Sequence, residues 1–522
     1  MHIEPSAQSF AARYAAGEPQ VVWTTLVADL ETPVSAFLKV AGARPEGSAP
    51  MSFLLESVEG GAVRGRYSIV GLEPDVIFRV TGRNAEINRA AQTDPAAFVA
   101  VEDEPLTALR NLIGESRIAL PPALPPMAAG VFGYLGYDMV RLMEELPAPG
   151  PDPLGIPDAV LLRPTLIVVF DAVNDTMTVV TPVRVQAGVT AKAALARAAE
   201  RLSAVVDALD RPLDKSAAPP PYPPPHASED REGVGPLDVK PHSNTTPDEF
   251  KRMVMRAKDY IAAGDIFQVV LSQRFEAPFT LPPFSLYRAL RRVNPSPYLF
   301  FLDFGSFAVA GSSPEILVKT SRGVVTIRPI AGTRGRGATP HEDLALEAEL
   351  LADPKERAEH LMLLDLGRND VGRVAEIGTV KVTDQFFIER YSQVMHIVSN
   401  VEGKLRHDRD AIDALAAGFP AGTVSGAPKV RAMEIIDELE KEKRSLYAGG
   451  VGYFSAGEEM DSCIVLRTAL IKDGTMYVQA GAGIVADSDP GFEQQECINK
   501  AAALFRAAEE AKRFASAAWR RQ

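Results

Sequence analysis

Residues 448–480 read AGGVGYFSAGEEMDSCIVLRTALIKDGTMYVQA, and their pattern predicts three strands in succession, at 448–455, 461–471 and 475–480. Earlier segments predict strands at 266–275, 299–310, 324–328 and 379–388, and helices at 341–352, 354–370, 410–417, 427–440 and 490–513. Strands mostly follow strands, with helices between the groups. This order predicts an α+β fold built on antiparallel sheets rather than a doubly wound fold.

The N-terminal part has a mixed pattern of its own. Strands are predicted at 21–30, 51–60, 65–74 and within 76–88 and 160–182, and helices at 32–42 and 191–209. After it comes a segment, 217–236, in which prolines around Tyr222 favour polyproline II and the polar residues that follow cannot form a core. We therefore divide the chain into an N-terminal region (1–215), a linker or surface loop (216–245) and a C-terminal region (246–522).

The composition excludes several classes of protein. The 522 residues carry a formal net charge of −13, which argues against nucleic acid and anionic membranes as partners. The two cysteines are too few for a disulfide framework or a cysteine metal site. No secretion signal or membrane-spanning segment is visible, so we expect a cytoplasmic protein. An anionic ligand would need a local cationic site.

Acidic residues on two predicted helices are candidates for binding a metal. Glu359 lies on the apolar face of the helix at 354–370, and a carboxylate there is costly unless it is paired or bound to metal. On the last helix, Glu493, Glu496 and Lys500 share one face. Carboxylates from two helices suit Mg²⁺, which takes few protein ligands. Ion pairing on a solvated face, such as Glu496 with Lys500, is the alternative.

Two other features leave their partners open. Arg467 interrupts a strand that is apolar on both faces, and a buried arginine normally pairs with a carboxylate of the protein or of a ligand. His396, in an apolar stretch, could equally be a hydrogen-bonded core residue. Three glycine-rich segments could present backbone N–H groups to an anion, although none is a P-loop and each alone could be a tight turn: 331–337, 421–429 and 479–485.

Many ordered blocks of the C-terminal region resemble one enzyme family. They include DIFQVVLSQRF, GSSPEILVK, RPIAGTRGRG, AEHLMLLDLGRNDVGRV, YSQVMHIVSNVEG, FPAGTVSGAPK, DSCIVLRTA and QAGAGIVADSDPGFEQQECINKA. From about 246 to 510 they resemble the chorismate-utilising enzymes, in particular the anthranilate-forming members. The resemblance implies antiparallel sheets packed as a sandwich with helices on the outside. It also implies conversion of chorismate and ammonia to anthranilate and pyruvate, the first committed step of tryptophan biosynthesis.

The resemblance assigns roles to individual residues of the C-terminal region. Glu359 and Glu496, with Glu493 beside them, match Mg²⁺ ligands, and Glu315 matches the general acid that protonates the leaving 4-hydroxyl. His396 and Thr423 are assigned to catalysis together with Glu315. The remaining matching positions are assigned to chorismate binding: Gly332, Thr333, Tyr447, Arg467, Gly481, Ala482, Gly483 and Lys500.

The N-terminal region resembles the family more weakly, through LLES followed by RYSIVG. This element implies a site for L-tryptophan as a feedback inhibitor, formed by Glu56, Ser57, Tyr67, Pro297, Tyr298, Leu299, Val451 and Tyr453. Glu56 would offer an acceptor and Ser57 a hydroxyl to the ammonium group. Inhibition is expected to be competitive or nearly so, and a large residue at Ser57 is expected to relieve it. LLES could instead be only the end of a strand.

Two positions separate branches of the family. Relatives that form isochorismate or salicylate carry a lysine where this chain has Gln268, and aminodeoxychorismate synthases carry a lysine where it has Ala331. Neither residue here is a base or nucleophile. A catalytically inactive tryptophan-binding regulator is a further alternative, although the candidate catalytic residues are all present. No amidotransferase motif is visible, so ammonia is expected from a separate glutamine amidotransferase subunit in a heterotetramer.

Overall fold

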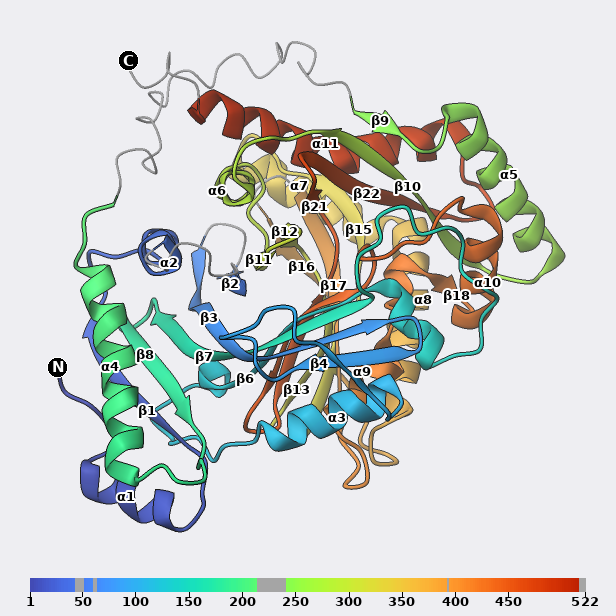
Figure 1. The fold of residues 1–522 in the computed structure, drawn as a ribbon. Coiled ribbons are helices and arrows are strands. Elements are labelled where there is room, and N and C mark those ends of the chain that lie inside the picture. The colour runs from blue at the N-terminus through green and yellow to red at the C-terminus, as the bar shows by residue number, and fades with distance from the viewer. Residues whose placement is uncertain (43–50, 60–62, 214–240, 392–393, 516–522) are drawn as a thin grey trace.

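The architecture is a network of antiparallel strands covered by helices (Figure 1). The computed structural model describes residues 1–42, 51–59, 63–213, 241–391 and 394–515. Within these residues, 22 strands are connected through hydrogen-bonded pairs. The pairs that join them run antiparallel, as in β10–β22 and β3–β7. The α+β prediction is confirmed.

The N-terminal region supplies eight strands and four helices to the described structure. The strands are β1 Gln20–Val27, β2 Met51–Glu59, β3 Val63–Thr81, β4 Asn84–Asn88, β5 Val99–Val101, β6 Gly130–Leu135, β7 Ala159–Asp171 and β8 Thr176–Val183. The helices are α1 Ala7–Ala15, α2 Pro33–Gly42, α3 Pro105–Glu115 and α4 Ala191–Leu209.

The C-terminal part continues the same pattern. Its strands are β9 His242–Ser243, β10 Gln268–Pro278, β11 Tyr298–Phe304, β12 Ala308–Ser313, β13 Ile316–Ser321, β14 Val324–Ile327, β15 Ile330–Gly335, β16 Lys381–Arg390, β17 Val394–Lys404, β18 Gly426–Ala427, β19 Gly450–Ser455, β20 Met460–Ile464, β21 Thr468–Lys472 and β22 Thr475–Ile484. Its helices are α5 Pro247–Ala263, α6 Pro283–Val293, α7 Pro340–Ala352, α8 Pro354–Gly372, α9 Ala411–Gly418, α10 Lys429–Leu439 and α11 Pro490–Ala515.

Two segments predicted as single strands are pairs of strands. Residues 299–310 form β11 and β12, which pair as a hairpin, and Gly305 in the turn has a φ of 82° that favours glycine. Residues 461–471 divide into β20 and β21. The division falls at Arg467, whose φ of 48° is in the left-handed region that non-glycine residues rarely adopt. The first break carried a turn signal, Gly305-Ser306, that the prediction overlooked, whereas at the second the apolar residues on both sides of Arg467 hid the turn.

Three hydrophobic clusters arrange the strands as a sandwich. One cluster consists almost wholly of strand and loop side chains from both regions, including Phe53, Phe132, Phe300 and Val451. Neighbouring residues of the same strands point away from it into two other clusters that contain the helices. Side chains alternate between the two faces of a strand, so this pattern places the strand-lined cluster between layers and the helices outside. Figure 1 shows α11 and α5 along one side of the strands.

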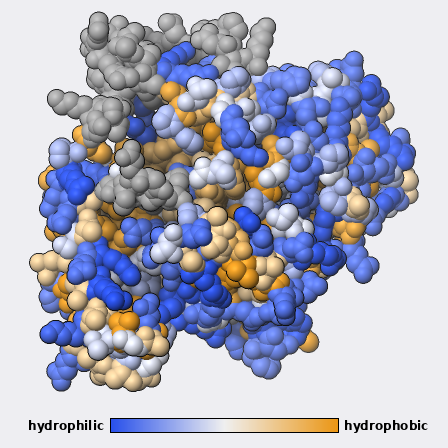
Figure 2. Space-filling model, viewed as in Figure 1, coloured by the Kyte–Doolittle hydropathy of each residue, from blue (hydrophilic) through white to orange (hydrophobic). Residues whose placement is uncertain are grey.

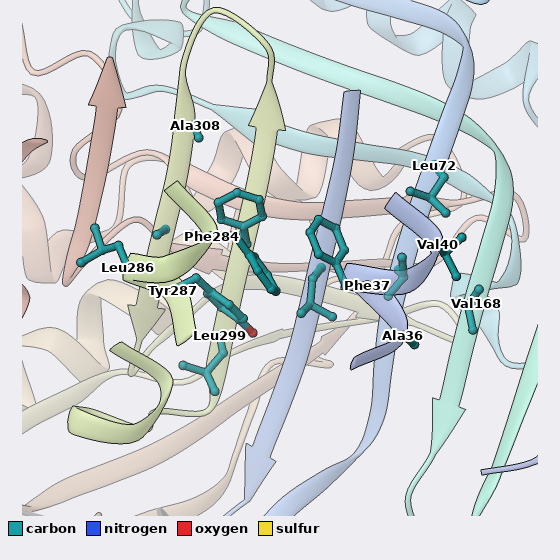
Figure 3. Packing of buried hydrophobic residues seen from close by; sticks show 14 of the residues in the cluster. Ala36, Phe37, Val40, Leu72, Val168, Phe284, Leu286, Tyr287, Leu299 and Ala308 are labelled. Atoms are coloured by element: carbon teal, nitrogen blue, oxygen red, sulfur yellow. The ribbon is translucent and has the colours of Figure 1, made fainter. Parts of the chain in front are cut away.

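The N- and C-terminal regions share the sheet. β2 pairs with β11 and β6 pairs with β19, so strands far apart in sequence are neighbours. Figure 3 shows α2 and α6 packed together on the sheet, and the rings of Phe37 and Phe284 are 4.5 Å apart. The division into regulatory and catalytic regions therefore does not correspond to separate structures, and their functional division stays a prediction.

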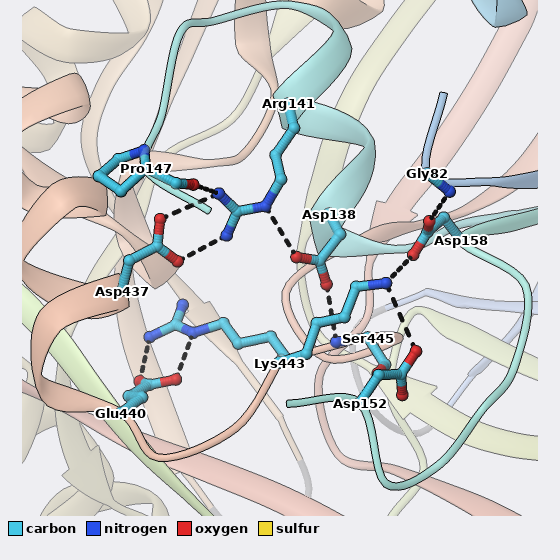
Figure 4. A network of polar contacts seen from close by, with 11 residues as sticks. Gly82, Asp138, Arg141, Pro147, Asp152, Asp158, Asp437, Glu440, Lys443 and Ser445 are labelled. Carbon is cyan, nitrogen blue, oxygen red and sulfur yellow. Dashed lines mark hydrogen bonds and ion pairs between the residues drawn. The ribbon is translucent and has the colours of Figure 1, made fainter. Parts of the chain in front are cut away.

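Polar contacts also join the two regions (Figure 4). Arg141 donates to Asp437 at 2.6 Å, and Lys443 lies 2.6 Å from Asp158. Most of the predicted linker, 216–240, is outside the described residues. Its last part is not wholly a loop as predicted, because β9 pairs with β10.

On the face shown in Figure 2, hydrophobic residues form separate groups among hydrophilic ones. Among the residues that the structure describes, no helix is long and apolar enough to cross a membrane.

Candidate functional site

The catalytic acid predicted from sequence, Glu315, is buried between β12 and β13 with 6% exposure. Thr423 Oγ1 donates to Glu315 Oε1 at 3.1 Å. Burial raises the pKa of Glu315 from 4.5 to about 8, and the hydrogen bonds from Thr423 and the Ile330 N–H oppose this shift. Glu315 is therefore mostly protonated at neutral pH, as a general acid requires.

His396, on β17, lies opposite Thr333 on β15. Its Nδ1 atom is 3.0 Å from the Gly332 carbonyl oxygen and 3.1 Å from Thr333 Oγ1. A carbonyl only accepts, so Nδ1 donates to it and Nε2 keeps a lone pair. Burial lowers the pKa of His396, and the charges of Arg467 and Lys500 lower it further. The histidine is a neutral group close to two cations.

Arg467 is the least satisfied cation of the site. Its φ of 48° places it at the break between β20 and β21. Burial lowers its pKa, and Tyr447 and Glu496 oppose this shift through their charges. Among the described residues, no carboxylate lies within ion-pair distance of its guanidinium. The described residues thus supply no carboxylate partner for Arg467, and binding of a ligand carboxylate stays a prediction.

The glycines of β22 bring further predicted residues to the same place. A Cβ atom at Gly481 would lie 2.9 Å from Tyr447 Oη, and one at Gly483 would lie 2.6 Å from Gln268 Nε2. Lys500 Nζ donates to the Gly481 carbonyl at 2.9 Å. Ala482, between the two glycines, is fully buried. The backbone of β22 therefore approaches these side chains without a side chain of its own between them.

The predicted metal ligands come close together from α8 and α11. Burial raises the pKa of Glu359, and the carboxylates of Glu356 and Glu496 raise it further. The pKa of Glu493 is raised to about 7 by burial and by Glu496, against the hydrogen bond from Ser488. Carboxylates this close repel one another until a proton or a cation intervenes. The site is thus rich in oxygen ligands.

The alternative of ion pairing is also present, since Lys500 Nζ lies 2.6 Å from Glu496 Oε1. Gln268 Nε2 donates to Glu359 at 3.2 Å, while its buried Oε1 has no partner in the described part of the chain. Within those residues no group of three or more possible ligands is arranged to hold a metal. The oxygen-only donor set fits Mg²⁺ if substrate or water oxygens complete the coordination.

All eight residues predicted to bind tryptophan line one cavity of about 930 Å³, at the upper end of the usual range for small-molecule sites. We call it the regulatory cavity: Glu56, Ser57, Tyr67, Pro297, Tyr298, Leu299, Val451 and Tyr453, with further residues that include Pro314, Ile316, Lys319, Ile330, Tyr391 and Asp461. Strand pairing explains this convergence, because β11 places Tyr298 opposite Ser57 of β2.

Glu56 lines the cavity, and its carboxylate accepts two hydrogen bonds from Arg291, at 2.7 and 2.9 Å, and a third from Tyr287. Its role as an acceptor for the ammonium group stays a prediction. Asp461, which the sequence prediction missed, is an acceptor on the wall of the cavity. It lies 3.2 Å from Tyr298 Oη and 3.3 Å from Lys319 Nζ. An acid in an otherwise apolar strand was the available signal.

Sequence reasoning also missed Arg444, which is 2% exposed. It pairs with Glu440 and donates to the carbonyls of Val424 at 2.7 Å and Val270 at 2.6 Å. Its guanidinium lies 5.5 Å from the centre of the Tyr447 ring. Arg444 therefore ties together the turn that carries Thr423, the strand that carries Gln268 and the ring of Tyr447.

Comparison with known proteins identifies relatives over the whole chain. The family described as chorismate binding enzyme matches residues 56–506. Anthranilate synthase component 1 of Cereibacter sphaeroides is 59% identical over 510 residues, covering 98% of both chains. The protein of that name from Pseudomonas aeruginosa is 47% identical, covering 92% of this chain and 94% of the other. The crystal structure of anthranilate synthase component I from Streptococcus pneumoniae is 37% identical, with a TM-score of 0.72, and the match covers 92% and 99% of the two chains.

Proposed function

The chain belongs to the family of chorismate binding enzymes, and from this premise we propose that it converts chorismate and ammonia into anthranilate and pyruvate. The observation that carries the proposal is a buried acid, Glu315, whose pKa is raised to about 8, in a site where Arg467 forms no ion pair with any residue that the structure describes. The two groups suit protonation of a leaving hydroxyl and binding of a carboxylate. Relatives named anthranilate synthase component 1 support the choice of product.

Substrate binding uses the cationic side of the site. Arg467 holds one carboxylate of chorismate through its planar pair of donors, and Tyr447 adds a hydroxyl. The absence of a side chain at Gly481 and Gly483 lets Tyr447 and Gln268 approach the β22 backbone closely. Lys500 contributes positive charge, part of which Glu496 neutralises at 2.6 Å. These groups make the electrostatic potential positive where the dianion binds, although the protein as a whole is acidic.

The reaction begins at Glu315. It donates its proton to the 4-hydroxyl, which leaves as water, while ammonia adds to the neighbouring ring carbon and then releases one proton. This gives aminodeoxyisochorismate, which loses pyruvate to form the aromatic ring. Thr423 orients Glu315 through its hydrogen bond. His396, held through Nδ1 by the Gly332 carbonyl, keeps Nε2 available as an acceptor near the ring.

Glu359 and Glu496, with Glu493 beside them, would hold Mg²⁺. When bound, the ion would supply Lewis-acid stabilisation of the ring carboxylate as negative charge shifts toward it. The residues fit this role because the raised pKa values of Glu359 and Glu493 record carboxylates crowded together in a partly buried place.

Two other reactions of the family suit this site less well. Gln268 cannot activate water as a lysine would, and its amide is already committed to Glu359. Ala331 is a buried side chain that cannot act as a nucleophile. Formation of isochorismate or of a 4-amino product would each need the missing group.

The test is incubation of the purified chain with chorismate, Mg²⁺ and ammonium at alkaline pH, with separation and fluorescence detection of the products. Anthranilate is the expected product. Isochorismate or a non-fluorescent amino compound would contradict the proposal. The absence of turnover would favour a tryptophan-binding regulator without activity.

We also propose that L-tryptophan inhibits the enzyme by binding in the regulatory cavity. Tyr298, Val451 and Tyr453 offer apolar surface to an indole, and Asp461 offers an acceptor to the ammonium group. The cavity also touches Pro314 and Ile316, which flank Glu315 in the chain. A ligand there can therefore shift the catalytic acid without entering the chorismate site.

Ser57 gives the sharpest test of this site. Its hydroxyl donates to the Tyr67 carbonyl at 3.0 Å, and its side chain lines the cavity. Ser57→Arg or Ser57→Phe should fill part of the cavity, reducing inhibition by tryptophan while leaving uninhibited activity close to that of the wild type. Ser203→Arg, an exposed position on α4, is the matched control and should remain sensitive. Full sensitivity of both Ser57 variants would reject the assignment.

The expected partner is a separate glutamine amidotransferase subunit that supplies ammonia, in a cytoplasmic heterotetramer. The relatives are named component 1, which implies a second component. Glutamine alone should therefore support no anthranilate formation by this chain, whereas ammonium should. Glutamine-dependent activity of the purified chain would contradict this part of the proposal.

A further inference from the structure

A small cavity lies behind the catalytic acid, which we call the acid cavity. Its volume is about 20 Å³, and Glu315, Thr423, Asp370 and Gly367 are among the residues that line it. The remaining wall is largely apolar and includes Ile327 and Pro329. A space of this size is enough for one water molecule when polar partners are present.

Asp370 supplies an unsatisfied acceptor at this cavity. It lies on α8 within the GRND segment, 367–370, and is 4% exposed. One carboxylate oxygen, Oδ2, accepts from the buried Lys429 ammonium at 2.9 Å. The other, Oδ1, is buried and forms no hydrogen bond of normal geometry with the described residues. A buried carboxylate oxygen in this position is strongly stabilised by a donor, which a water molecule provides.

Glu315, which also lines the acid cavity, needs a source of protons. In the proposed reaction it gives one proton to the departing hydroxyl in every turnover, and the nitrogen that adds to the ring gives one up. The protons balance overall, but Glu315 is left as a buried carboxylate that must be protonated again. Its one side-chain hydrogen bond in the described structure comes from Thr423, which also lines the acid cavity.

We propose that the acid cavity holds an ordered water bound to Asp370 Oδ1, and that this water returns a proton to Glu315, by way of the Thr423 hydroxyl, after each turnover. The inference rests on the proposed function. Thr423 passes its own hydroxyl proton to Glu315 and takes one from the water. The water regains a proton from solvent, and the proton released by the added nitrogen passes to solvent, so each group ends the cycle unchanged. Asp370 is then a positioning residue, because it holds the water without touching the substrate.

Gly367 allows the cavity to be filled without damage to the fold. A Cβ atom there would meet its nearest neighbours, Ile327 and Pro329, at 3.6 and 3.8 Å, which is ordinary van der Waals contact. Both neighbours line the acid cavity, so the methyl group of Gly367→Ala enters the space assigned to water. Alanine is also a better helix former than glycine. Gly372→Ala on the same helix has nothing within 4 Å and is the matched control.

The experiment compares single and multiple turnovers of chorismate with ammonium. Both assays are run at pH 7, where Glu315 starts mostly protonated, so Gly367→Ala should keep the single-turnover rate of the wild type with enzyme in excess. Its steady-state kcat should fall about tenfold or more, because proton return becomes limiting. Its thermal midpoint should equal or exceed that of the wild type, and Gly372→Ala should match the wild type in both assays.

The results that overturn the inference are distinct from those that overturn the proposed function. An unchanged kcat for Gly367→Ala, or an equal loss in single and multiple turnovers, rejects the proton relay. A high-resolution crystal structure of the wild type with no water at Asp370 Oδ1 also rejects it. Failure of the wild type to form anthranilate rejects the proposed function itself.

Discussion

Replacing Glu315 by glutamine removes the proton that the side chain donates but keeps the volume that it fills, so the two contributions can be measured separately. Glutamine has nearly the shape of a protonated glutamic acid, and its carbonyl can still accept from Thr423, which lies 3.1 Å from Oε1 in the wild type. Its amide cannot protonate a leaving hydroxyl. We expect kcat to fall about 10²–10⁴-fold, the usual contribution of a general acid, with little change in KM for chorismate.

The same substitution has a calculable effect on stability. The pKa of Glu315 is raised from 4.5 to about 8 by burial, so between these values the folded state binds a proton that the unfolded state has released. Stability from this group is fully present below the unfolded pKa and is lost as pH rises through the folded pKa. The loss is about 1.36 kcal/mol per pH unit well below the folded pKa and smaller near it, or roughly 2 kcal/mol between pH 6 and pH 8. Glutamine does not titrate and is spared this loss.

The assay is urea unfolding of the wild type and Glu315→Gln at pH 6, 7 and 8. The difference in free energy of unfolding between the two proteins should grow by roughly 2 kcal/mol in favour of the variant over this range. Glu18→Gln, at an exposed position, is the control and should show no such trend. A difference that does not depend on pH would refute the buried, protonated acid, and activity within about tenfold of the wild type would refute its role as proton donor.

Three further substitutions test other parts of the site. Arg467→Lys should lower kcat/KM for chorismate about 10–100-fold without loss of thermal stability, because the guanidinium has no ion-pair partner among the described residues; unchanged kinetics would contradict its role in binding. Glu359→Gln should abolish both activity and any rise of the thermal midpoint on adding Mg²⁺, and a persistent rise would place the ion elsewhere. Arg444→Lys should lower the free energy of unfolding by about 3 kcal/mol in urea titrations, because two carbonyls and Glu440 lose donors; an unchanged midpoint would reject Arg444 as a tie between segments.

A few candidate site residues could be identified from the sequence alone because they break local patterns, whereas most of the others rest on the family resemblance. Glu359 is a charge on an apolar helix face, and Arg467 is a charge within an apolar strand. Burying a charge costs free energy unless a partner or ligand compensates it, so a charged residue in an apolar pattern can be recognised from the sequence. The antiparallel architecture was predictable for a similar reason, since strands that follow one another closely leave no room for crossover helices.

Other features depend on contacts between distant segments and could not be predicted. In the sequence Asp370 is an ordinary polar residue near the end of a helix. Its burial depends on Lys429, 59 residues later, which donates to its carboxylate. The hydrogen bonds that Arg291 donates to Glu56 from α6, across the shared sheet, are likewise not visible in the sequence. The turn at Arg467 was missed because its backbone conformation is imposed by the surroundings rather than by its residue type.

The central claim is that this site attaches the nitrogen of ammonia to the ring of chorismate and releases pyruvate. The most direct measurement is mass spectrometry of the products formed by the purified chain from chorismate, Mg²⁺ and ¹⁵N-labelled ammonium. The account predicts labelled anthranilate and an equal amount of pyruvate. An unlabelled isomer of chorismate, or a labelled product that retains the enolpyruvyl group, would contradict it.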